Sequence, residues 1–276
     1  EQTAAAQLRD KMDWIPSVKG VGLFPSGTEL EVSTFIEITT KNYGDLPVFG
    51  AMACTDVKFM MQSTPDEFDE NVFGIGEKIM PHGFTAVIFA GEKLNVMMDY
   101  ILGWKPLGKE LSIKIGPKEK YGEGSIELID GRPAVEIYQK YLGVGWDENF
   151  LWNVAEFPLM VHRGYEDICM LPLAKGDNGE LYFSAPIEKH ENIRFSYGNR
   201  SDILGASEAG RKRMYKFKPE AVFLSMCGNR INYLQDEAHI EWDNYKILFP
   251  ELVFCHGLYE IGLQDGHGGV LNSSIV

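Results

Sequence analysis

The pattern of hydrophobic and polar positions is clearest between residues 221 and 262. An apolar run with high β propensity (residues 221–226) is followed by a turn (227–230) and a helical segment of mixed polarity (231–245). A second apolar run (251–255) and a second turn (256–257) come next. A strand, a helix and a strand within this length predict one βαβ unit, with a right-handed crossover if the strands are parallel. Both turns would then lie at the carboxyl ends of neighbouring strands, where open α/β sheets usually hold ligands.

Similar patterns divide the rest of the chain into helices and strands. Helices are predicted over residues 1–13, 32–41, 133–142 and 200–217, and strands over 21–24, 46–53, 84–90, 94–104, 111–115, 125–129, 157–161, 167–173, 180–184 and 192–197. The helix from Pro133 has the strongest pattern, because Pro suits the first helical position and Gly143 suits the residue after the last. Strands and helices mix without strict alternation, which predicts the class α/β (mixed α+β) with mixed sheets and a C-terminal βαβ unit.

The length of 276 residues is enough for two domains. We place their boundary near residue 130, just before the helix that begins at Pro133, which gives domains 1–130 and 131–276. The chain begins without Met and stops on Ile275-Val276, so we expect it to be an excised fragment.

Charge and hydropathy exclude two classes of partner. The formal net charge is −14, whereas proteins that bind nucleic acid need a basic face. The main basic cluster, Arg211-Lys212-Arg213 with Lys216 and Lys218, is interpreted as a solvated helix end. No apolar run approaches the roughly 18 residues of a transmembrane helix, and the first 13 residues lack the apolar core of a signal peptide. We therefore expect no nucleic acid and no membrane segment.

The cysteines and the known sequence motifs point away from metal and cofactor chemistry. The four cysteines are scattered and no two have metal-ligand spacing. Three of them lie in or beside apolar runs, which is typical of free thiols in a reduced, intracellular protein: Cys54, Cys169 and Cys227. No P-loop, kinase, Ser-hydrolase or zinc motif is present. We expect no cofactor, no metal and no catalytic residue.

Arg230 and Glu260 are the strongest candidates for ligand binding. A guanidinium can hold a ligand carboxylate with two hydrogen bonds, and a carboxylate can hold an ammonium group. An amino acid needs both partners. The alternative is that the two side chains neutralise each other in a structural ion pair, or that Arg230 caps backbone carbonyls.

Other candidates lie beside the same turns, on the helix between them, or after the apolar run 46–53. Cys227 and His256 could form a thiolate-imidazole pair, as in a Cys-dependent hydrolase or transferase. The alternative for Cys227 is buried packing without reactivity. Asp56 follows the apolar run 46–53 and is placed either to meet a ligand or to cap a turn. His239 and Glu241 have no metal-ligand partner at helical spacing, so both are interpreted as surface residues.

Several stretches resemble one known family in order and spacing. Residues 50–53, 71–74, 83–91 and 102–108 resemble the N-terminal half of the FIST sensory domain, and residues 131–143, 157–159, 225–230, 260–262 and 271–273 resemble its C-terminal half. The resemblance covers nearly the whole chain. It implies that the first domain lacks the family's first strands and helices and that the second lacks its final strand.

The resemblance implies a cytoplasmic input module of bacterial signal transduction. Such modules occur beside histidine kinase, diguanylate cyclase or chemotaxis-receptor output domains, and are thought to sense small ligands such as amino acids. On this basis we expect a non-enzymatic module that binds a small polar metabolite and regulates a fused output domain, with a homodimer formed through the parent protein. A docking domain for another protein is a further alternative.

The predicted ligand-binding set combines both lines of reasoning: Arg230, Glu260, Cys227, Ser225, Asp56 and Tyr259. Tyr259 stands where similar proteins usually have Gly before the Glu of the closing motif. We therefore expect the pocket to be unusual at this position.

Overall fold

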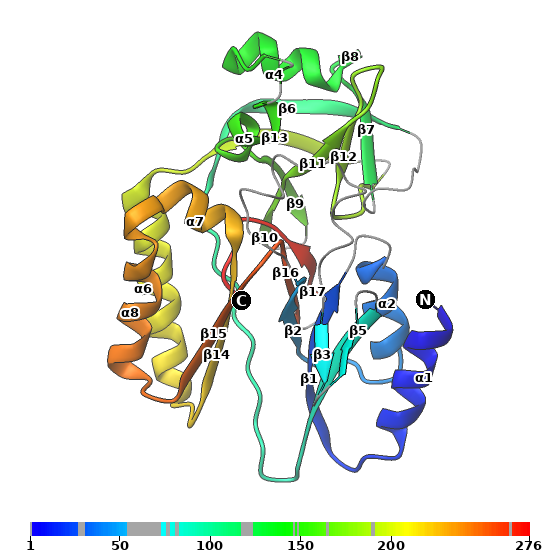
Figure 1. Ribbon diagram of the computed structural model, residues 1–276, viewed down its shortest axis with the longest axis vertical. Helices are drawn as coiled ribbons and strands as arrows, with labels where there is room; N and C mark the ends of the chain where they lie inside the picture. The colour runs from blue at the N-terminus through cyan, green and yellow to red at the C-terminus, as the bar shows by residue number, and fades with distance from the viewer. Residues whose placement is uncertain are drawn as a thin grey trace.

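The computed structural model describes residues 2–26, 31–53, 73–75, 78–80, 83–116, 124–145, 147, 149–163, 166–188, 191–264 and 267–276. These residues form two larger sheets and a separate βαβ unit, with helices packed on each (Figure 1). The predicted class, mixed α+β with mixed sheets, is confirmed.

The first sheet has five strands in the order β17-β16-β2-β1-β5. They are β1 (Val18–Ser26), β2 (Val48–Ala51), β5 (Gly83–Ala90), β16 (Glu260–Gln264) and β17 (His267–Leu271). β1 and β2 are parallel, and the other neighbours are antiparallel. The helices α1 (Gln2–Asp13) and α2 (Val32–Thr40) cover this sheet through a buried apolar cluster that includes Leu8, Phe35 and Leu23.

Gly50 allows β2 to lie against β1 in the middle of this sheet. Its φ is 151°, and a Cβ at this position would lie 1.9 Å from the carbonyl oxygen of Leu23. Only glycine avoids that clash. The prediction of a central strand within residues 46–53 is confirmed, since β2 lies between β1 and β16.

The second sheet is antiparallel, with the order β10-β9-β13-β6-β7-β12-β11 and β8 paired to β7. Its strands are β6 (Lys105–Ile115), β7 (Gly124–Ile129), β8 (Arg132–Pro133), β9 (Leu159–Arg163), β10 (Glu166–Met170), β11 (Pro172–Lys175), β12 (Leu181–Phe183) and β13 (Asn192–Tyr197). The helices α4 (Ala134–Leu142) and α5 (Phe150–Ala155) pack on it through Tyr138 and Phe150. Gly143 ends α4 in the left-handed conformation, as predicted. A short hairpin, β3 (Phe73–Ile75) and β4 (Lys78–Met80), forms a two-stranded sheet of its own.

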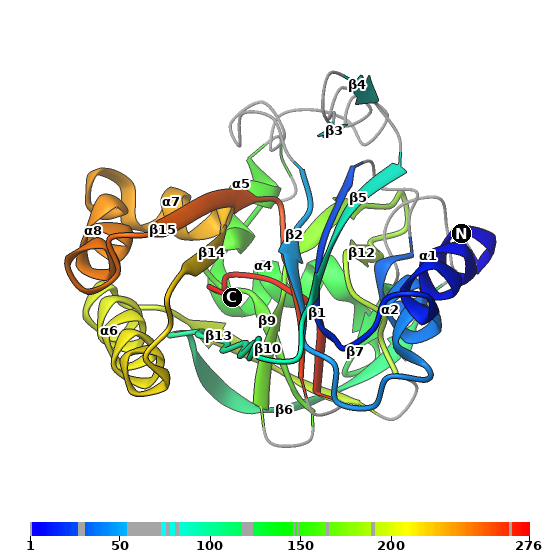
Figure 2. The same ribbon diagram turned by 90° about the horizontal axis from the view of Figure 1, so that it is seen from below.

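The predicted βαβ unit is present and its strands are parallel. β14 (Val222–Cys227) pairs with β15 (Leu252–Gly257) over six residues. The connection contains α7 (Gly228–Leu234), a 3₁₀ turn η2 (Gln235–Glu237) and α8 (His239–Leu248), instead of the single helix predicted over residues 231–245. The long helix α6 (Arg200–Phe217) precedes the unit. Seen from below, β14 and β15 lie between α6 and α8 on one side and β2 of the first sheet on the other (Figure 2).

The predicted strand over residues 94–104 is wrong. Most of this segment has no strand partner, and only Ile101 forms a bridge, to Ile275. The regular strand is β6, which begins at Lys105 and includes the strand predicted over residues 111–115. Ile101 and Trp104 are buried individually because the segment crosses between packed elements, so their apolar character does not come from a sheet position.

The two sheets exchange strands between the halves of the chain. β6 and β7 precede residue 130 but pair with β13 and β12, whereas β16 follows it and pairs with β2. The boundary near residue 130 stays a prediction. Within the described ranges, no helix combines the length and the apolar character needed to cross a bilayer.

Candidate functional site

The first sheet and the βαβ unit meet at the carboxyl ends of β14 and β15. Cys227 ends β14, Gly257 ends β15, and Glu260 begins β16 three residues later. Residues 272–276 run beside β14, where the amide of Cys227 donates to the carbonyl oxygen of Ser274 at 3.0 Å. On the other side, the amide of Met52 donates to the carbonyl oxygen of Tyr259 at 3.0 Å. The chemistry of this junction comes from the side chains between these backbone contacts.

Most of the Arg230 guanidinium is bound to groups of the protein. Its Nε and Nη2 donate to the two carboxylate oxygens of Glu241 at 3.0 and 2.5 Å. Its Nη1 donates to the carbonyl oxygens of Ser273 at 2.8 Å and Leu102 at 2.5 Å. These four bonds use most of the five N–H groups of a guanidinium. The ring of Trp104 lies 5.6 Å from the guanidinium carbon and covers it further.

The carboxylate that Arg230 binds is Glu241, and not Glu260 as in the ion pair considered from the sequence. Glu241 is 2% exposed, so its interpretation as a surface residue is wrong, whereas His239 is exposed as predicted. The chain turns at Gln235, which has a φ of 51°, and α8 therefore folds back toward α7. This turn brings Arg230 and Glu241 together.

Glu260 is completely buried but has an incomplete set of partners. Its Oε2 accepts a hydrogen bond from the Ser274 hydroxyl at 3.1 Å, and its Oε1 has no partner among the described residues. Burial raises the pKa of this carboxyl well above its usual range, and the Ser274 bond, the neighbouring Cys227 thiol and the charge of Arg230 only partly oppose the increase. No ion pair to Glu260 is formed within the described part of the chain.

Cys227 lies against Glu260 and is not activated. Its thiol donates to the carbonyl oxygen of Leu258 at 3.5 Å. Burial, and then the neighbouring Glu260 carboxyl, raise the pKa of the thiol well above its usual value, which favours the unreactive protonated form.

The structure does not bring Cys227 and His256 together. Met226 is opposite His256 in the parallel pair, and Cys227 is opposite Gly257. Because successive side chains point to opposite faces of a strand, the thiol and the imidazole lie on different faces. His256 instead lies edge-on to Trp242, with ring centroids 5.4 Å apart, and burial lowers its pKa.

The remaining predicted residues have different surroundings. The Ser225 hydroxyl donates to the carbonyl oxygen of Gly50 at 2.8 Å, which joins the βαβ unit to the first sheet. Cys255, beside Ser225, has a thiol whose pKa is raised to about 11 by burial. Tyr259 is buried in the apolar cluster under α1 and α2. Asp56 lies outside the described residues.

Sequence reasoning missed Glu241 and Ser274. Glu241 stands three residues after Ala238 and four before Tyr245, so it shares a helix face with apolar residues, which was the available signal of burial. Ser274 had no signal of its own, because its role depends on residues 272–276 lying beside β14.

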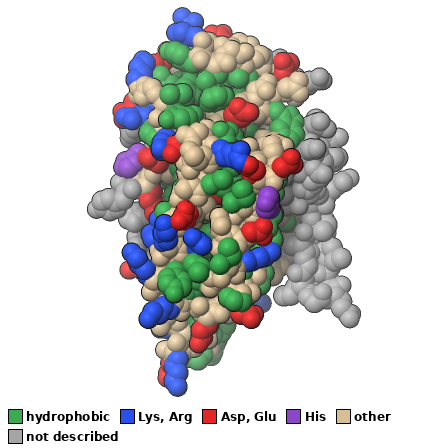
Figure 3. All heavy atoms as spheres, turned by 90° about the vertical axis from the view of Figure 1, so that its left-hand side faces the viewer, with side chains coloured by type: hydrophobic (Ala, Val, Ile, Leu, Met, Phe, Trp, Pro, Cys, Tyr) green, Lys and Arg blue, Asp and Glu red, His purple; other side chains and the backbone are tan. Residues whose placement is uncertain are grey.

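The basic cluster of α6 does not form a separate binding surface. Lys212 pairs with Glu208 at 2.7 Å, and Arg213 binds both carboxylate oxygens of Asp99 at 2.8 and 3.1 Å. On the face that α6 and α8 present, basic and acidic side chains are interspersed (Figure 3). This arrangement agrees with a solvated helix end.

The fold and the junction together define a two-part α+β module with a buried polar centre. A model of the FIST N domain matches residues 1–116, and a model of the FIST C domain matches residues 134–262. The chain therefore belongs to the FIST family, whose domains are sensory modules of signal transduction. Neither the curated proteins nor the solved structures contain a match to this chain.

Proposed function

We propose that this chain is the ligand-sensing input module of a cytoplasmic, bacterial signalling protein. It binds a small polar metabolite where the βαβ unit meets the first sheet, and it regulates a fused output domain. The observation that carries the proposal is Glu260, a buried carboxyl with one oxygen that has no partner among the described residues.

A carboxyl in this position is costly for the fold by itself. Removing an ionisable group from water without a compensating partner costs several kcal/mol, or forces the group to take up a proton. Perturbed groups of this kind cluster at functional sites, because binding and chemistry need them. A ligand that supplies the missing partner would recover part of this free energy on binding.

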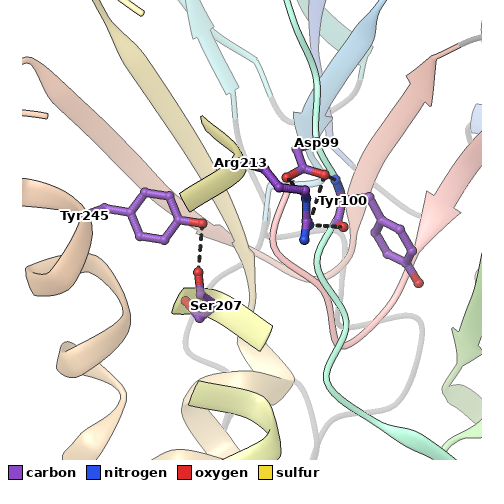
Figure 4. Close-up of polar contacts among 5 residues, drawn as sticks. All are labelled: Asp99, Tyr100, Ser207, Arg213 and Tyr245. Atoms are coloured by element: carbon purple, nitrogen blue, oxygen red, sulfur yellow. Dashed lines mark hydrogen bonds and ion pairs between the residues drawn. The ribbon is translucent and has the colours of Figure 1, made fainter. Parts of the chain in front are cut away.

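The contacts around the junction suggest how binding is transmitted. α6 is fastened to residues 99–102 by Arg213, which binds Asp99 and reaches the Tyr100 carbonyl oxygen, and α8 is fastened to α6 by Tyr245 through the Ser207 carbonyl oxygen (Figure 4). The helices α6 and α8, here called the helical layer, are thus joined to residues 99–102 and should move with them.

The contact of the βαβ unit with the first sheet adds to the backbone hydrogen bonds that join β14 to residues 274–276. It includes the Ser225 hydrogen bond to Gly50 and the packing of Phe223 against Phe24 and Phe49. Ligand entry at Glu260 would separate these surfaces and shift the module between two arrangements. The shift is limited by the ligand's differential affinity for the two.

A thermal-shift screen tests the proposal. Wild type, Glu260→Gln and Glu251→Gln are screened against amino acids, amines, organic acids, sugars and nucleosides. A ligand raises the melting temperature of wild type by mass action. The shift should be lost in Glu260→Gln and retained in Glu251→Gln, which makes the same change at an exposed position of the same unit. No shift with any compound, or equal shifts in all three proteins, would contradict the proposal.

A further inference from the structure

We infer that the site at Glu260 selects a small organic amine over the corresponding amino acid. This inference rests on the proposed function and specifies the class of ligand.

The charge balance of the buried groups is the first step. Among the described residues, the side chains of Arg230, Glu241 and Glu260 are charged groups with at most 2% exposure. Arg230 and Glu241 neutralise each other through two hydrogen bonds. Glu260 is left as a buried carboxyl without a cationic partner, which keeps its proton, so a ligand cation would complete the cluster by replacing that proton.

The commitment of Arg230 is the second step, because it removes the partner that an amino acid needs. An amino acid brings a carboxylate together with its ammonium group. The groups beside Glu260 are the Cys227 thiol and the Ser274 hydroxyl, and both are uncharged. Placing a second carboxylate among them would bury another negative charge without a cation, which is strongly unfavourable.

The shape of β14 is the third step and indicates which kind of chain the ammonium group should carry. Phe223, Ser225 and Cys227 share one face of the strand, and the residues between them pack on the other face against the helices. Phe223 contacts Phe24 and Phe49, with ring centroids 5.6 and 6.1 Å apart. An amine with a short apolar chain would place its charge at Glu260 and its chain along this face toward the aromatic residues.

Space at the junction limits the size of the ligand. A Cβ at Gly257 would lie 2.6 Å from the Ala51 Cβ and 2.9 Å from the Met52 carbonyl oxygen. The backbones of β15 and the first sheet are therefore in close contact beside Glu260. A ligand of few heavy atoms requires the smallest separation of these two surfaces.

Binding of an amine also has a proton signature. Burial favours the protonated Glu260 carboxyl, whereas an adjacent ammonium group favours the carboxylate. Amine binding should therefore release a proton from Glu260, and affinity should increase with pH as long as the amine itself remains charged. A zwitterion bound elsewhere would not show this release.

Two matched pairs of probes test the inference by isothermal titration calorimetry. n-Butylamine is compared with norvaline, and phenethylamine with phenylalanine, because the members of each pair differ only in the carboxylate. Each probe is titrated into wild type, Glu260→Gln and Glu251→Gln, in two buffers with different ionisation enthalpies.

We expect each amine to bind wild type at least about tenfold more tightly than its amino acid. A difference of this size in affinity is typical of one hydrogen bond to a charged group. Glu260→Gln should lose about tenfold in amine affinity and Glu251→Gln should not change. The observed enthalpy in wild type should depend on the buffer, as required by proton release. This last readout needs no variant, so it holds even if Glu260→Gln folds poorly.

The outcomes separate the inference from the proposed function. Amino acids that bind as tightly as their amines, or amine binding without proton release, would overturn the inference, while metabolite binding itself would still support a sensory module. If no compound of the wider metabolite screen binds either, the proposed function fails together with the inference.

Discussion

Two glutamates of this molecule are buried to the same degree and have opposite surroundings. Glu241 is 2% exposed, and both of its carboxylate oxygens accept hydrogen bonds from Arg230. Glu260 is 0% exposed, with one oxygen bonded to Ser274 and the other without a partner among the described residues. Burial alone therefore does not distinguish the two glutamates, whereas the completeness of their hydrogen bonds does.

The positions of the two glutamates explain the difference. Glu241 lies on α8, within the helical layer, and its ion pair with Arg230 also reaches the carbonyl oxygens of Leu102 and Ser273. It joins four segments into one unit. Glu260 lies at the start of β16, where that unit meets the first sheet. The completed pair holds that unit together, and the incomplete group lies at its contact with the first sheet, where we propose that a ligand binds.

The largest expected effect comes from removing the charge of Glu241. Glu241→Gln leaves the Arg230 guanidinium buried without a counter-charge, and breaking a buried ion pair in this way costs about 3–5 kcal/mol. We expect a loss of this size in the free energy of unfolding, measured by urea denaturation at pH 7. A double variant, Arg230→Met with Glu241→Gln, should lose less than the sum of the single changes. A loss below about 1 kcal/mol in Glu241→Gln would show that the pair is not structural.

The fastening of α6 to its neighbours gives the next effect. A Cβ at Gly210 would lie 2.3 Å from the Ile101 Cδ1 and 3.0 Å from the Tyr245 hydroxyl. Gly210→Ala should therefore lower the free energy of unfolding by about 1–3 kcal/mol, as overpacking does in other cores. An unchanged urea midpoint would mean that residues 99–102 and α8 do not pack on α6 as described.

Replacing Glu260 with Gln should change the free energy of unfolding in the opposite direction to Glu241→Gln. The pKa of Glu260 is raised in the folded protein, so its proton stabilises the fold below the unfolded pKa of about 4.3, and this contribution is lost as pH rises toward the folded pKa. Relative to Glu260→Gln, wild type should lose stability with increasing pH, by at most about 1.4 kcal/mol per pH unit.

Urea denaturation of both proteins between pH 5 and pH 8 measures this difference. The comparison cancels other titrating groups, among them His256, whose lowered pKa acts in the opposite direction. Curves that stay parallel across this range, or a wild type that gains stability relative to the variant, would show that Glu260 is ionised and compensated in the fold.

The smallest effect is a control within α6. Gly205 is exposed, and a Cβ there would meet no atom within 4 Å. Gly205→Ala should stabilise the protein by roughly 0.5–1 kcal/mol, because alanine is the better helix former. Destabilisation at this site would indicate that substitutions in α6 lower stability regardless of packing. The Gly210→Ala result would then no longer report on the contacts with Ile101 and Tyr245.

Local elements of the fold were predictable because their signals are local. α6 and β13 have the predicted bounds, Arg200–Phe217 and Asn192–Tyr197. The side chain of Asn199 accepts from the amide of Asp202 at 2.9 Å and so marks the start of α6. The βαβ unit was predicted from its two apolar runs for the same reason.

The partner of Arg230 was not predictable in this way. In one continuous helix, Arg230 and Glu241 would be separated by about 16 Å along the axis, at 1.5 Å per residue. They meet because the chain turns at Gln235, a residue that rarely adopts a positive φ, and no glycine marks the turn.

The setting of Glu260 depends on contacts between distant segments. Ile261 of β16 lies opposite Gly50 of β2, and residues 272–276 lie beside β14. Neither pairing has a local signal in the amino-acid pattern. The sequence therefore indicated Glu260 as a candidate, but only the fold shows that Arg230 is not its partner.

The most direct test of the central claim is a measurement of the Glu260 pKa by carbon-detected NMR. The carboxyl carbons of glutamate are labelled with ¹³C, and the Glu260 signal is assigned by its absence in Glu260→Gln. We predict a pKa above the ordinary value of about 4.3 without an added amine, and a lower pKa when n-butylamine is saturating. A pKa at or below the ordinary value, or one that the amine does not change, would contradict the account.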